Sequence, residues 1–439
     1  MTDKTRVHKA KKPIRILAKD VTVKADERAL QNLNTLCVGC SGSGKTRSFV
    51  SPNISASTES MVVIDSKLNL FGKHKKELEA KGYQVELIDL CNLSNSSIGY
   101  NPMDFIRKKE DDSAVIDDVK ELASLICADE EFQSLKDGFW QTANRDYISA
   151  CISMTIRLLV PQEVNLNSVS KILNYINTPE WNTLLAEAKL NGGSDCLEVA
   201  ISRQIKDGIT ADRMGSSILA MCKSAIQLFN WEGSSELYSM KRRINFTDLG
   251  NKKTAVFLNI PDHDYSKVAL VRVFFSQCLK SLLDHADQQK NSMLKEKVHI
   301  FCDDIGANFV IPHLPELISI TRSRGISLSL MLQSVDQLYS KYGVYDANVI
   351  IANCSSMVLL GGNTDYDTAL FFSNKANIPI ERIIEMSPTS ELVCLQNKCF
   401  FATKHNEDDY RPIEYTEEPI AELERDYDER GDHYEKEAS

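Results

Sequence analysis

Apolar residues in this chain gather into short runs that are separated by segments of helical period. The runs are β-prone and lie at 33–38, 61–65, 83–90, 254–260, 298–303, 326–333, 355–361 and 391–396. In most of the intervening segments the apolar residues recur every three or four positions, as they do in amphipathic helices. This alternation predicts an α/β fold, in which helices flank a mostly parallel sheet.

The strand pattern disappears between about residues 111 and 238, where only helical patterns remain. One of these patterns, at residues 139–159, carries an apolar stripe at helical spacing: Tyr147, Cys151, Met154 and Leu158. Such a stripe must be buried against other elements. We therefore expect residues 111–238 to form an all-α domain that is inserted into the sheet domain.

A glycine-rich segment directly follows the first apolar run. It satisfies the pattern G-x-x-x-x-G-K-[ST] with Gly39, Cys40, Ser41, Gly42, Ser43, Gly44, Lys45 and Thr46. A strand, a glycine loop and a helix start together allow successive backbone N–H groups to surround a phosphate. Lys45 would then reach the β- and γ-phosphates of ATP, and the Thr46 hydroxyl would bind Mg²⁺. These residues and the adjacent Arg47 are predicted to bind the nucleotide.

A magnesium-nucleotide site also needs carboxylates. Asp303 ends the apolar run at 298–303, and Asp304 follows it directly. Asp303 is expected to bind the metal, directly or through water, and Asp304 to act as general base for the attacking water. Asp65 is an alternative metal ligand, because parallel strands deliver their carboxyl ends to one edge of a sheet. Asp303 lies 258 positions after Lys45. An insertion that leaves and re-enters the sheet still allows the two to meet.

Composition and charge narrow the class of protein. No apolar run approaches the roughly 20 residues of a membrane-spanning helix, and no apolar signal core follows the charged N-terminus, so we expect a cytoplasmic protein. The twelve cysteines are irregularly spaced, which indicates buried thiols rather than a disulfide framework. Cys37 and Cys40 lack a second pair for a zinc site.

The net charge of −10 arises in the last part of the chain. Residues 407–439 hold fourteen acidic and four basic residues, so the remainder is near neutral and its charge does not exclude a nucleic-acid partner. Four segments are thus expected. They are a nucleotide-binding domain in two parts (1–110 and 239–404), the inserted all-α domain (111–238) and an acidic tail (405–439).

Several longer motifs recur in an order that is more selective than the glycine loop. They are "MVVIDSKLNLF", "KGYQVELIDL" with "GYNPMDF", "FWQTANRDYISACI", "TAVFLNIPDHD", and "ISITRSRGISLSLMLQSVDQLYSKYG" with "ANVIIANCSSMVLLGGNTDYDTALFFS". With these motifs, between about residues 34 and 404, the chain resembles the conjugative coupling proteins of the TraG and TraD type. That family consists of P-loop motor ATPases with a RecA/FtsK-HerA-like core. They hand a relaxase-bound DNA strand to a type IV secretion channel.

The resemblance implies further residues and partners. Gln333, at the end of an apolar run, would sense the γ-phosphate or the attacking water. Arg322 would reach the nucleotide of the next subunit, with Arg324 in reserve. A trans arginine needs a closed ring, and the family implies a homo-hexamer that threads DNA through its central pore by backbone contacts. A relaxase and components of the secretion channel would be the protein partners.

The chain departs from the family in two respects. The family usually carries an N-terminal pair of membrane helices, which this sequence does not show. Either a separate membrane subunit recruits the chain to the cytoplasmic face of the membrane, as we expect, or the anchor was lost or removed. The acidic strand of the family usually ends in Asp-Glu, whereas Asp304 takes the place of the Glu here. We expect slower hydrolysis, because a displacement of about 1 Å can cost on the order of 10²-fold in rate.

The sequence leaves two functions open. In the first, the chain is a Mg²⁺-dependent, DNA-stimulated ATPase that powers conjugative DNA translocation. In the second, it is a nucleotide-gated adaptor that binds ATP and recruits a relaxase or effector with little turnover. A chromosome-pumping or DNA-end-processing motor would share the core but would not predict the inserted helical domain.

Overall fold

The computed structural model describes residues 12–24, 32–110, 113–128, 138–193, 196–208, 212–260, 265–303, 310–396 and 398–405. These residues divide into two compact units. The first unit draws on residues 1–59, 301–306 and 327–439, and the second on residues 60–300 and 307–326.

The first unit combines a hairpin with part of the main sheet. The hairpin is β1 (Ile14–Ala18) and β2 (Val21–Lys24), and the sheet strands are β3 (Thr35–Val38), β8 (Ile326–Leu332), β9 (Ser356–Leu360), β10 (Ser390–Leu395) and β11 (Lys398–Thr403). β3 pairs in parallel with β8 and β9, whereas β10 is antiparallel to β9 and β11. All residues of β3, β8 and β9 are buried, which explains their continuous apolar runs.

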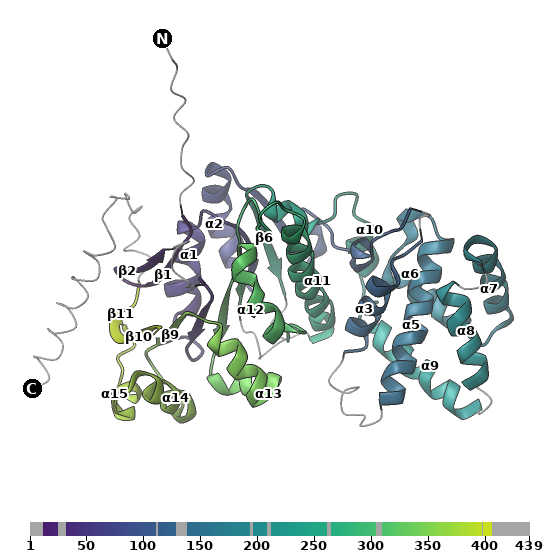
Figure 1. Ribbon diagram of the computed structural model, residues 1–439. Helices are drawn as coiled ribbons and strands as arrows, with labels where there is room; N and C mark the ends of the chain where they lie inside the picture. Colours follow the sequence, from purple (N-terminus) through teal and green to yellow (C-terminus); the bar gives the residue numbers. More distant parts are fainter. Residues whose placement is uncertain are drawn as a thin grey trace, which may run out of the picture. The chain divides into compact units, whose positions relative to one another are not determined.

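The helices of the first unit lie between these strands in the chain (Figure 1). They are η1 (Lys45–Val50), α1 (Ser51–Ala56), α13 (Val335–Ala352), α14 (Tyr366–Ala376) and α15 (Ile380–Ile384). η1 has wide π-type turns and runs directly into α1, with Pro52 in the first turn of α1. A proline is tolerated in a first turn, because the N–H that it lacks has no partner within the helix there. The helix after the glycine loop therefore continues past Pro52 and changes from π-type to α-helical hydrogen bonding between Val50 and Ser51.

A buried amide sets the pairing of β3. Asn34 lies directly before β3 and is fully buried. Its Oδ1 accepts a hydrogen bond from the N–H of Leu328 (2.9 Å), and its Nδ2 donates to the carbonyl of Asn353 (3.1 Å). Because an all-apolar strand can shift without losing burial, polar groups with fixed partners are needed to hold its register. In this register Val38 lies opposite Leu332.

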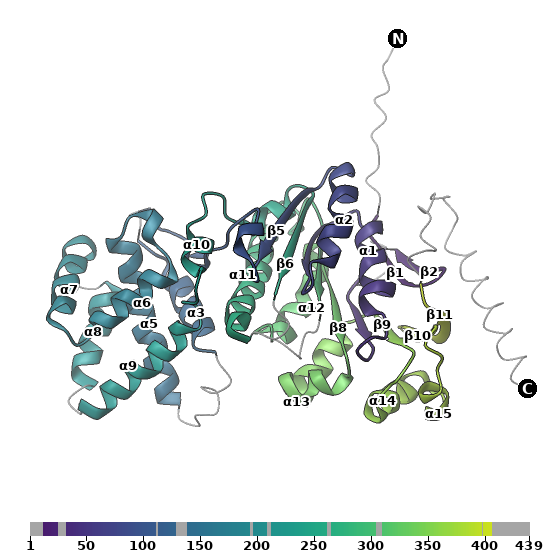
Figure 2. The same ribbon diagram turned by 180° about the vertical axis from the view of Figure 1, so that it is seen from behind.

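The second unit contains the remaining strands of the sheet. They are β4 (Ser60–Ile64), β5 (Gln84–Asp89), β6 (Thr254–Asn259) and most of β7 (Val298–Cys302). β6 pairs in parallel with both β4 and β5. Figures 1 and 2 show β5 and β6 between the helices α2 (Asn69–Ala80) and α11 (Val268–Asp287), and α12 (Leu314–Arg324) follows β7 in the chain. The main sheet has the strand order β11-β10-β9-β3-β8-β7-β4-β6-β5.

Between residues 116 and 239 every described regular element is a helix. These helices are α3 (Ile116–Ile126), α5 (Gly138–Leu158), η4 (Pro161–Glu163), α6 (Leu166–Tyr175), α7 (Pro179–Gly192), α8 (Leu197–Gly208), α9 (Asp212–Gln227) and α10 (Ser234–Ser239). The long helix α5 contacts α3, α6, α7, α8 and α9 (Figure 2). Of the apolar stripe predicted on it, Tyr147, Cys151 and Met154 are buried and Leu158 is half-buried. The stripe is therefore the surface on which the other helices pack.

The sequence patterns did not indicate β1, β2 or β11. In β1 a buried arginine, Arg15, interrupts the apolar run, and its charge is balanced by the buried Glu59 (2.5 Å), which lies 44 positions later. Arg15 also donates to the hydroxyl of Ser327. β11 is only half-buried, so its apolar signal is weak. Because Glu59 is distant in sequence from Arg15, and because β11 is partly exposed, neither strand has a clear local sequence pattern.

Two further expectations concern cysteines and membrane spans. Cys394 and Cys399 form a cross-strand disulfide between β10 and β11, so the expectation of thiols alone is wrong at this pair. The ten other cysteines are free, and seven of them are buried, as small apolar residues often are. No helix in the described part of the chain is long and apolar enough to cross a membrane.

Candidate functional site

The glycine loop begins where β3 ends and lies beside the end of β8. The N–H of Gly39 donates to the carbonyl of Leu332 (3.0 Å), which continues the parallel pairing. Gly42 and Gly44 have positive φ angles of 80° and 96°, which residues with a Cβ rarely adopt. The helix then starts at Lys45. This geometry leaves backbone N–H groups without helix partners at one place, an arrangement suited to an anion.

Lys45 is directed back onto the loop. Its Nζ donates to the carbonyl of Gly39 (2.6 Å) and, more weakly, to that of Cys40 (3.4 Å). Ser41, Thr46 and Arg47 are exposed, whereas Cys40 and Ser43 are partly buried. The ammonium group of Lys45 is thus hydrogen-bonded to the backbone of the loop, and the exposed Thr46 offers a hydroxyl.

Asp303 lies near the strand that leads into the loop. It follows β7 directly and is partly buried. The pKa of Cys37, in β3, is raised chiefly by burial; Asp303 raises it further, whereas Lys45 lowers it. Glu391 also raises this pKa, by more than Asp303 does. In the sheet, β8 lies between β7 and β3, so Asp303 follows a strand that is two positions from the strand of the loop. Asp304, the predicted general base, lies outside the described residues.

Gln333 is adjacent to the loop through the backbone. It is the residue after β8, and the residue before it, Leu332, accepts the hydrogen bond from Gly39. The N–H of Gln333 donates to Oε1 of Gln337 (2.9 Å), which fixes the chain as it turns into α13. The amide of Gln333 is half-buried at the edge of the sheet from which the glycine loop leaves.

Asp65, the alternative metal ligand, belongs to the second unit and is engaged locally. Its Oδ2 accepts a hydrogen bond from the N–H of Phe71 (2.7 Å) at the start of α2. Burial raises the pKa of Asp65, and hydrogen bonds from the backbone N–H groups of Phe71, Leu70, Asn69 and Lys67 oppose that shift. A carboxylate that accepts this many backbone hydrogen bonds has the role of a helix-start residue.

The two candidate arginines lie in the last turn of α12, also in the second unit. Arg322 is exposed. Arg324 donates from Nε to Oδ1 of Asp287 (3.0 Å), at the end of α11. This ion pair engages Arg324 within its own unit.

Two residues beside the loop were missed by the sequence analysis. Lys404 follows β11, and its Nζ donates to the carbonyls of Ser43 (2.8 Å) and Gly361 (2.7 Å). Glu391, in β10, is buried, and burial raises its pKa to about 8, which Lys404 partly opposes. No motif could have indicated them, because their proximity to the loop depends on the pairing of β9, β10 and β11.

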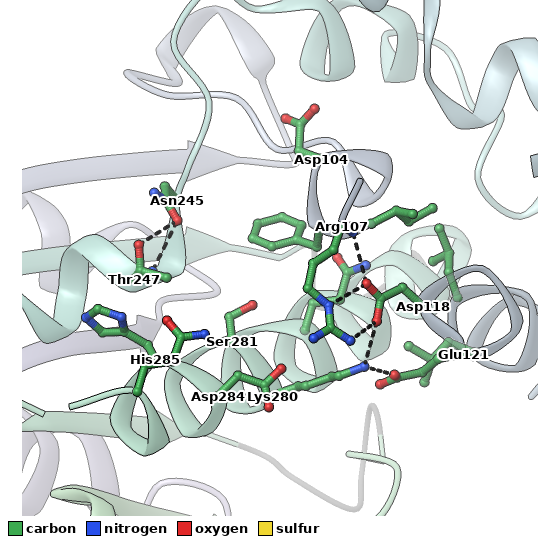
Figure 3. A pocket seen from close by; sticks show the side chains of 16 residues that line it. Asp104, Arg107, Asp118, Glu121, Asn245, Thr247, Lys280, Ser281, Asp284 and His285 are labelled. Atoms are coloured by element: carbon green, nitrogen blue, oxygen red, sulfur yellow. Dashed lines mark hydrogen bonds and ion pairs between the residues drawn. The ribbon is translucent and has the colours of Figure 1, made fainter. Parts of the chain in front are cut away.

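A second group of polar side chains lies in the second unit, around a cavity of about 220 Å³ (Figure 3). It is formed where η3 (Pro102–Phe105) and η5 (Phe246–Gly250) meet α3 and α11. Its charged side chains bind one another: Arg107 pairs with Asp118 (2.8 Å), and Lys280 pairs with Asp118 and Glu121. The ion pairs of Lys280 with Asp118 and Glu121 hold α3 against α11.

Comparison with known proteins decides the family. Residues 2–376 match the family model described as "Type IV secretory system Conjugative DNA transfer". The chain belongs to this family. The match extends over most of the sequence, and the predicted resemblance to conjugative coupling proteins is confirmed. No curated protein matches the chain.

Several solved structures share the fold of this chain. The bacterial conjugative coupling protein TrwB, as an unbound form lacking its N-terminal part, is 12% identical with a TM-score of 0.65, over 91% of this chain and 89% of that chain. TrwB in complex with ADP and Mg²⁺ is 13% identical with a TM-score of 0.64, over 85% and 86%. VirB4 of Thermoanaerobacter pseudethanolicus is 12% identical with a TM-score of 0.56, over 92% and 98%. The predicted fold class, an α/β P-loop NTPase fold with a mostly parallel sheet, is confirmed.

Proposed function

We propose that this member of the conjugative DNA transfer family binds and hydrolyses ATP with Mg²⁺, and uses the energy to move DNA toward a type IV secretion channel. The observation that carries the proposal is the convergence of three predicted groups in the first unit. Lys45 follows the loop after β3, Asp303 follows β7, and Gln333 follows β8, the strand between these two, whose last residue is hydrogen-bonded to Gly39. These groups are distant in sequence, and their proximity is what nucleotide hydrolysis requires.

The residues present fit a magnesium nucleotide. The positive φ angles of Gly42 and Gly44 and the helix start at Lys45 form an anion-binding turn, in which Gly39, Cys40, Ser41, Ser43 and Arg47 also take part. Lys45 would exchange its loop carbonyls for phosphate oxygens. Thr46 and Asp303 would hold Mg²⁺, which supplies neutralisation of the phosphate charge. TrwB, whose fold this chain shares, is known in complex with ADP and Mg²⁺.

The hydrolysis step assigns one role to each remaining residue. Asp304 would accept a proton from the water that attacks the γ-phosphorus, while the bond between that phosphorus and the β–γ bridging oxygen breaks to give ADP and phosphate. Gln333 would orient the attacking water or bind the γ-phosphate. Arg322 would stabilise the charge in the site of a neighbouring subunit. That role needs a ring, so we propose a homo-hexamer with DNA in its central pore.

The remaining proposals follow from the family. The chain would be divided into a nucleotide-binding domain in two parts, an inserted all-α domain and an acidic tail. The partners would be a relaxase and components of the secretion channel. The protein would act at the cytoplasmic face of the membrane, through a partner subunit.

The experiment compares the wild type with Lys45→Ala and Asp304→Asn. We expect DNA-stimulated release of phosphate by the wild type. Lys45→Ala should bind ATP roughly 10- to 100-fold more weakly, because it loses a charged hydrogen-bond donor. Asp304→Asn should bind ATP with unchanged affinity and release almost no phosphate. Calorimetry and a phosphate assay measure the two quantities separately.

The adaptor remains the second candidate function, and the replacement of the family's Glu by Asp304 favours it, because a displaced base slows hydrolysis. Tight ATP binding without turnover on any DNA would identify the adaptor. If the wild type did not bind ATP at all, both functions would be refuted.

A further inference from the structure

We propose that Lys404 is a positioning residue of the nucleotide loop, which orients the peptide between Ser43 and Gly44 so that the N–H of Gly44 faces the phosphates. This inference rests on the proposed nucleotide binding. Lys404 lies outside the glycine-loop motif, 361 positions after Ser43. It donates from Nζ to the carbonyl of Ser43 (2.8 Å) and to that of Gly361 (2.7 Å).

The main chain of Lys404 is held in place. Its N–H donates to the carbonyl of Thr389 (2.8 Å), and the preceding residue, Thr403, pairs with Ser390 at the end of the β10–β11 hairpin. The carbonyl of Thr403 also accepts a hydrogen bond from the N–H of Lys19 in the turn between β1 and β2 (3.0 Å). The ammonium group therefore extends toward the loop from a fixed base.

The planarity of the peptide bond transmits this restraint to the phosphate side of the loop. The carbonyl of Ser43 and the N–H of Gly44 belong to one trans peptide, so they point in opposite directions. When Nζ of Lys404 holds the carbonyl, the N–H of Gly44 is directed away from Lys404. Gly44 has φ 96° and ψ 18°, and glycine by itself has little preference for one conformation. The hydrogen bond from Lys404 helps to select this one, together with the hydrogen bond from the N–H of Ser48 to the carbonyl of Gly44 (2.7 Å).

Lys45 and Lys404, the two lysines that are hydrogen-bonded to the backbone of the loop, have separate acceptors. Lys45 donates to the carbonyls of Gly39 and Cys40, at the start of the loop. Lys404 donates to Ser43, near its end, and to Gly361, directly after β9. Lys45 can leave its acceptors for a phosphate without disturbing the hydrogen bonds of Lys404. The second lysine therefore keeps the loop in shape while the first one binds the ligand.

The test measures ADP binding in the presence of Mg²⁺ for the full chain and for Lys404→Met, Lys404→Arg and Lys375→Met. Methionine keeps the length of the side chain and removes its donors, whereas arginine restores charged donors. Lys375, exposed in α14 of the same unit, is the matched control. We expect Lys404→Met to weaken ADP binding roughly tenfold, as for the loss of one charged hydrogen bond. Lys404→Arg should recover part of the affinity, and Lys375→Met should equal the wild type.

Thermal unfolding separates a positioning role from a structural one. If Lys404 positions the loop, Lys404→Met retains most of its melting temperature without nucleotide and loses most of the increase that ADP produces. A lower melting temperature without nucleotide, with the ADP-induced increase and the dissociation constant unchanged, would overturn the inference. If Lys404→Met does not fold, Lys404→Gln, which keeps a neutral donor, is measured against the same criteria. Absence of ADP binding by the wild type would refute the proposed function itself and this inference with it.

Discussion

Asp118 in the second unit and Glu391 in the first unit are both buried carboxyl groups, but the pKa of Asp118 is lowered whereas that of Glu391 is raised. Asp118, in α3 of the second unit, accepts hydrogen bonds from the N–H (2.9 Å), Nε (2.8 Å) and Nη2 (2.8 Å) of Arg107, as Figure 3 shows in part. Lys280 adds a longer contact (3.4 Å). Burial alone would raise the pKa of Asp118, but the hydrogen bonds outweigh burial and lower it. Asp118 is therefore ionised at neutral pH.

Glu391, in β10 of the first unit, has no comparable set of donors. Its side chain is buried, and among the described residues its Oε1 has no hydrogen-bond partner. Burial raises the pKa of Glu391 to about 8, and Lys404 opposes this shift only in part. The donors of Lys404 are directed to the carbonyls of Ser43 and Gly361. Lys404, the cation that acts on this carboxyl group, thus binds the backbone of the glycine loop instead.

The difference lies in what the cation binds at each of the two sites. At Asp118, charged side chains neutralise each other and hold two helices together. At Glu391, the cation holds the backbone of a loop and the buried acid is left incompletely satisfied, although the first unit also contains a neutralised buried pair, Arg15 with Glu59. A polar group that is poorly satisfied in the fold is a common feature of functional sites, where local stability is lost in exchange for a required geometry.

The largest effect is expected for Asp118→Ala. The change removes the acceptor for Arg107 and Lys280, and breaking a buried pair is costly, although Arg107 is partly exposed and regains water. We expect the free energy of unfolding to fall by about 3 kcal/mol. Urea unfolding followed by circular dichroism measures it. Asp117→Ala, on the exposed side of the same helix, is the control and should change it by less than about 0.5 kcal/mol. Equal values for both variants would contradict a role for the Asp118 hydrogen bonds.

A pH series sharpens the comparison for the wild type. The folded pKa of Asp118 is lowered, so its contribution to stability is present above the unfolded pKa of about 3.9 and is lost as the pH falls through the folded value. The folded pKa of Glu391 is raised to about 8, so its contribution is present below the unfolded pKa of about 4.3 and is lost as the pH rises through about 8.

Glu391→Gln should remove the loss at high pH. The amide resembles the neutral acid in shape and does not ionise, so at pH 9 we expect the variant to be more stable than the wild type by on the order of 2 kcal/mol. Near pH 5 the two should be similar. Glu385→Gln, an exposed residue of the same unit, is the control. The same pH dependence in the wild type and in Glu391→Gln would show that another group is responsible.

The smallest effect is expected for Asp287→Asn, which breaks the ion pair with Arg324. Both side chains are partly exposed, so the pair should contribute no more than about 0.5 kcal/mol, and less at high salt. Thermal unfolding at low and high salt measures it. A loss comparable to that of Asp118→Ala would mean that this surface pair stabilises the fold as strongly as the buried hydrogen bonds of Asp118 do.

Much of the fold could be predicted from apolar patterns. Every predicted apolar run corresponds to a strand, from β3 to β10, because buried parallel strands need continuous apolar residues. The hairpin β1–β2 and the strand β11 could not be predicted. Arg15 is compatible with a buried strand only because Glu59 and Ser327 reach it from elsewhere in the chain.

The candidate site could be predicted where its chemistry is local. The glycine loop is encoded in consecutive residues, and Asp303 and Gln333 could be suggested because each directly follows a strand. Lys404 and Glu391 could not, because their relation to the loop arises from strand pairing. The assignments of Asp304 and Arg322 stay predictions, since they concern a residue outside the described part and a contact with another subunit.

The geometry of the glycine loop depends on Asn34, which lies at the opposite end of β3 from the loop. Side chains alternate between the two faces of a strand, so a slip of β3 by one position against β8 would bring a different backbone carbonyl to Gly39 and would turn Gln333 toward the other face relative to the loop. The apolar side chains of both strands would remain buried after such a slip. A single amide, four positions before Val38, thereby fixes which residue at the end of β8 lies beside the glycine loop.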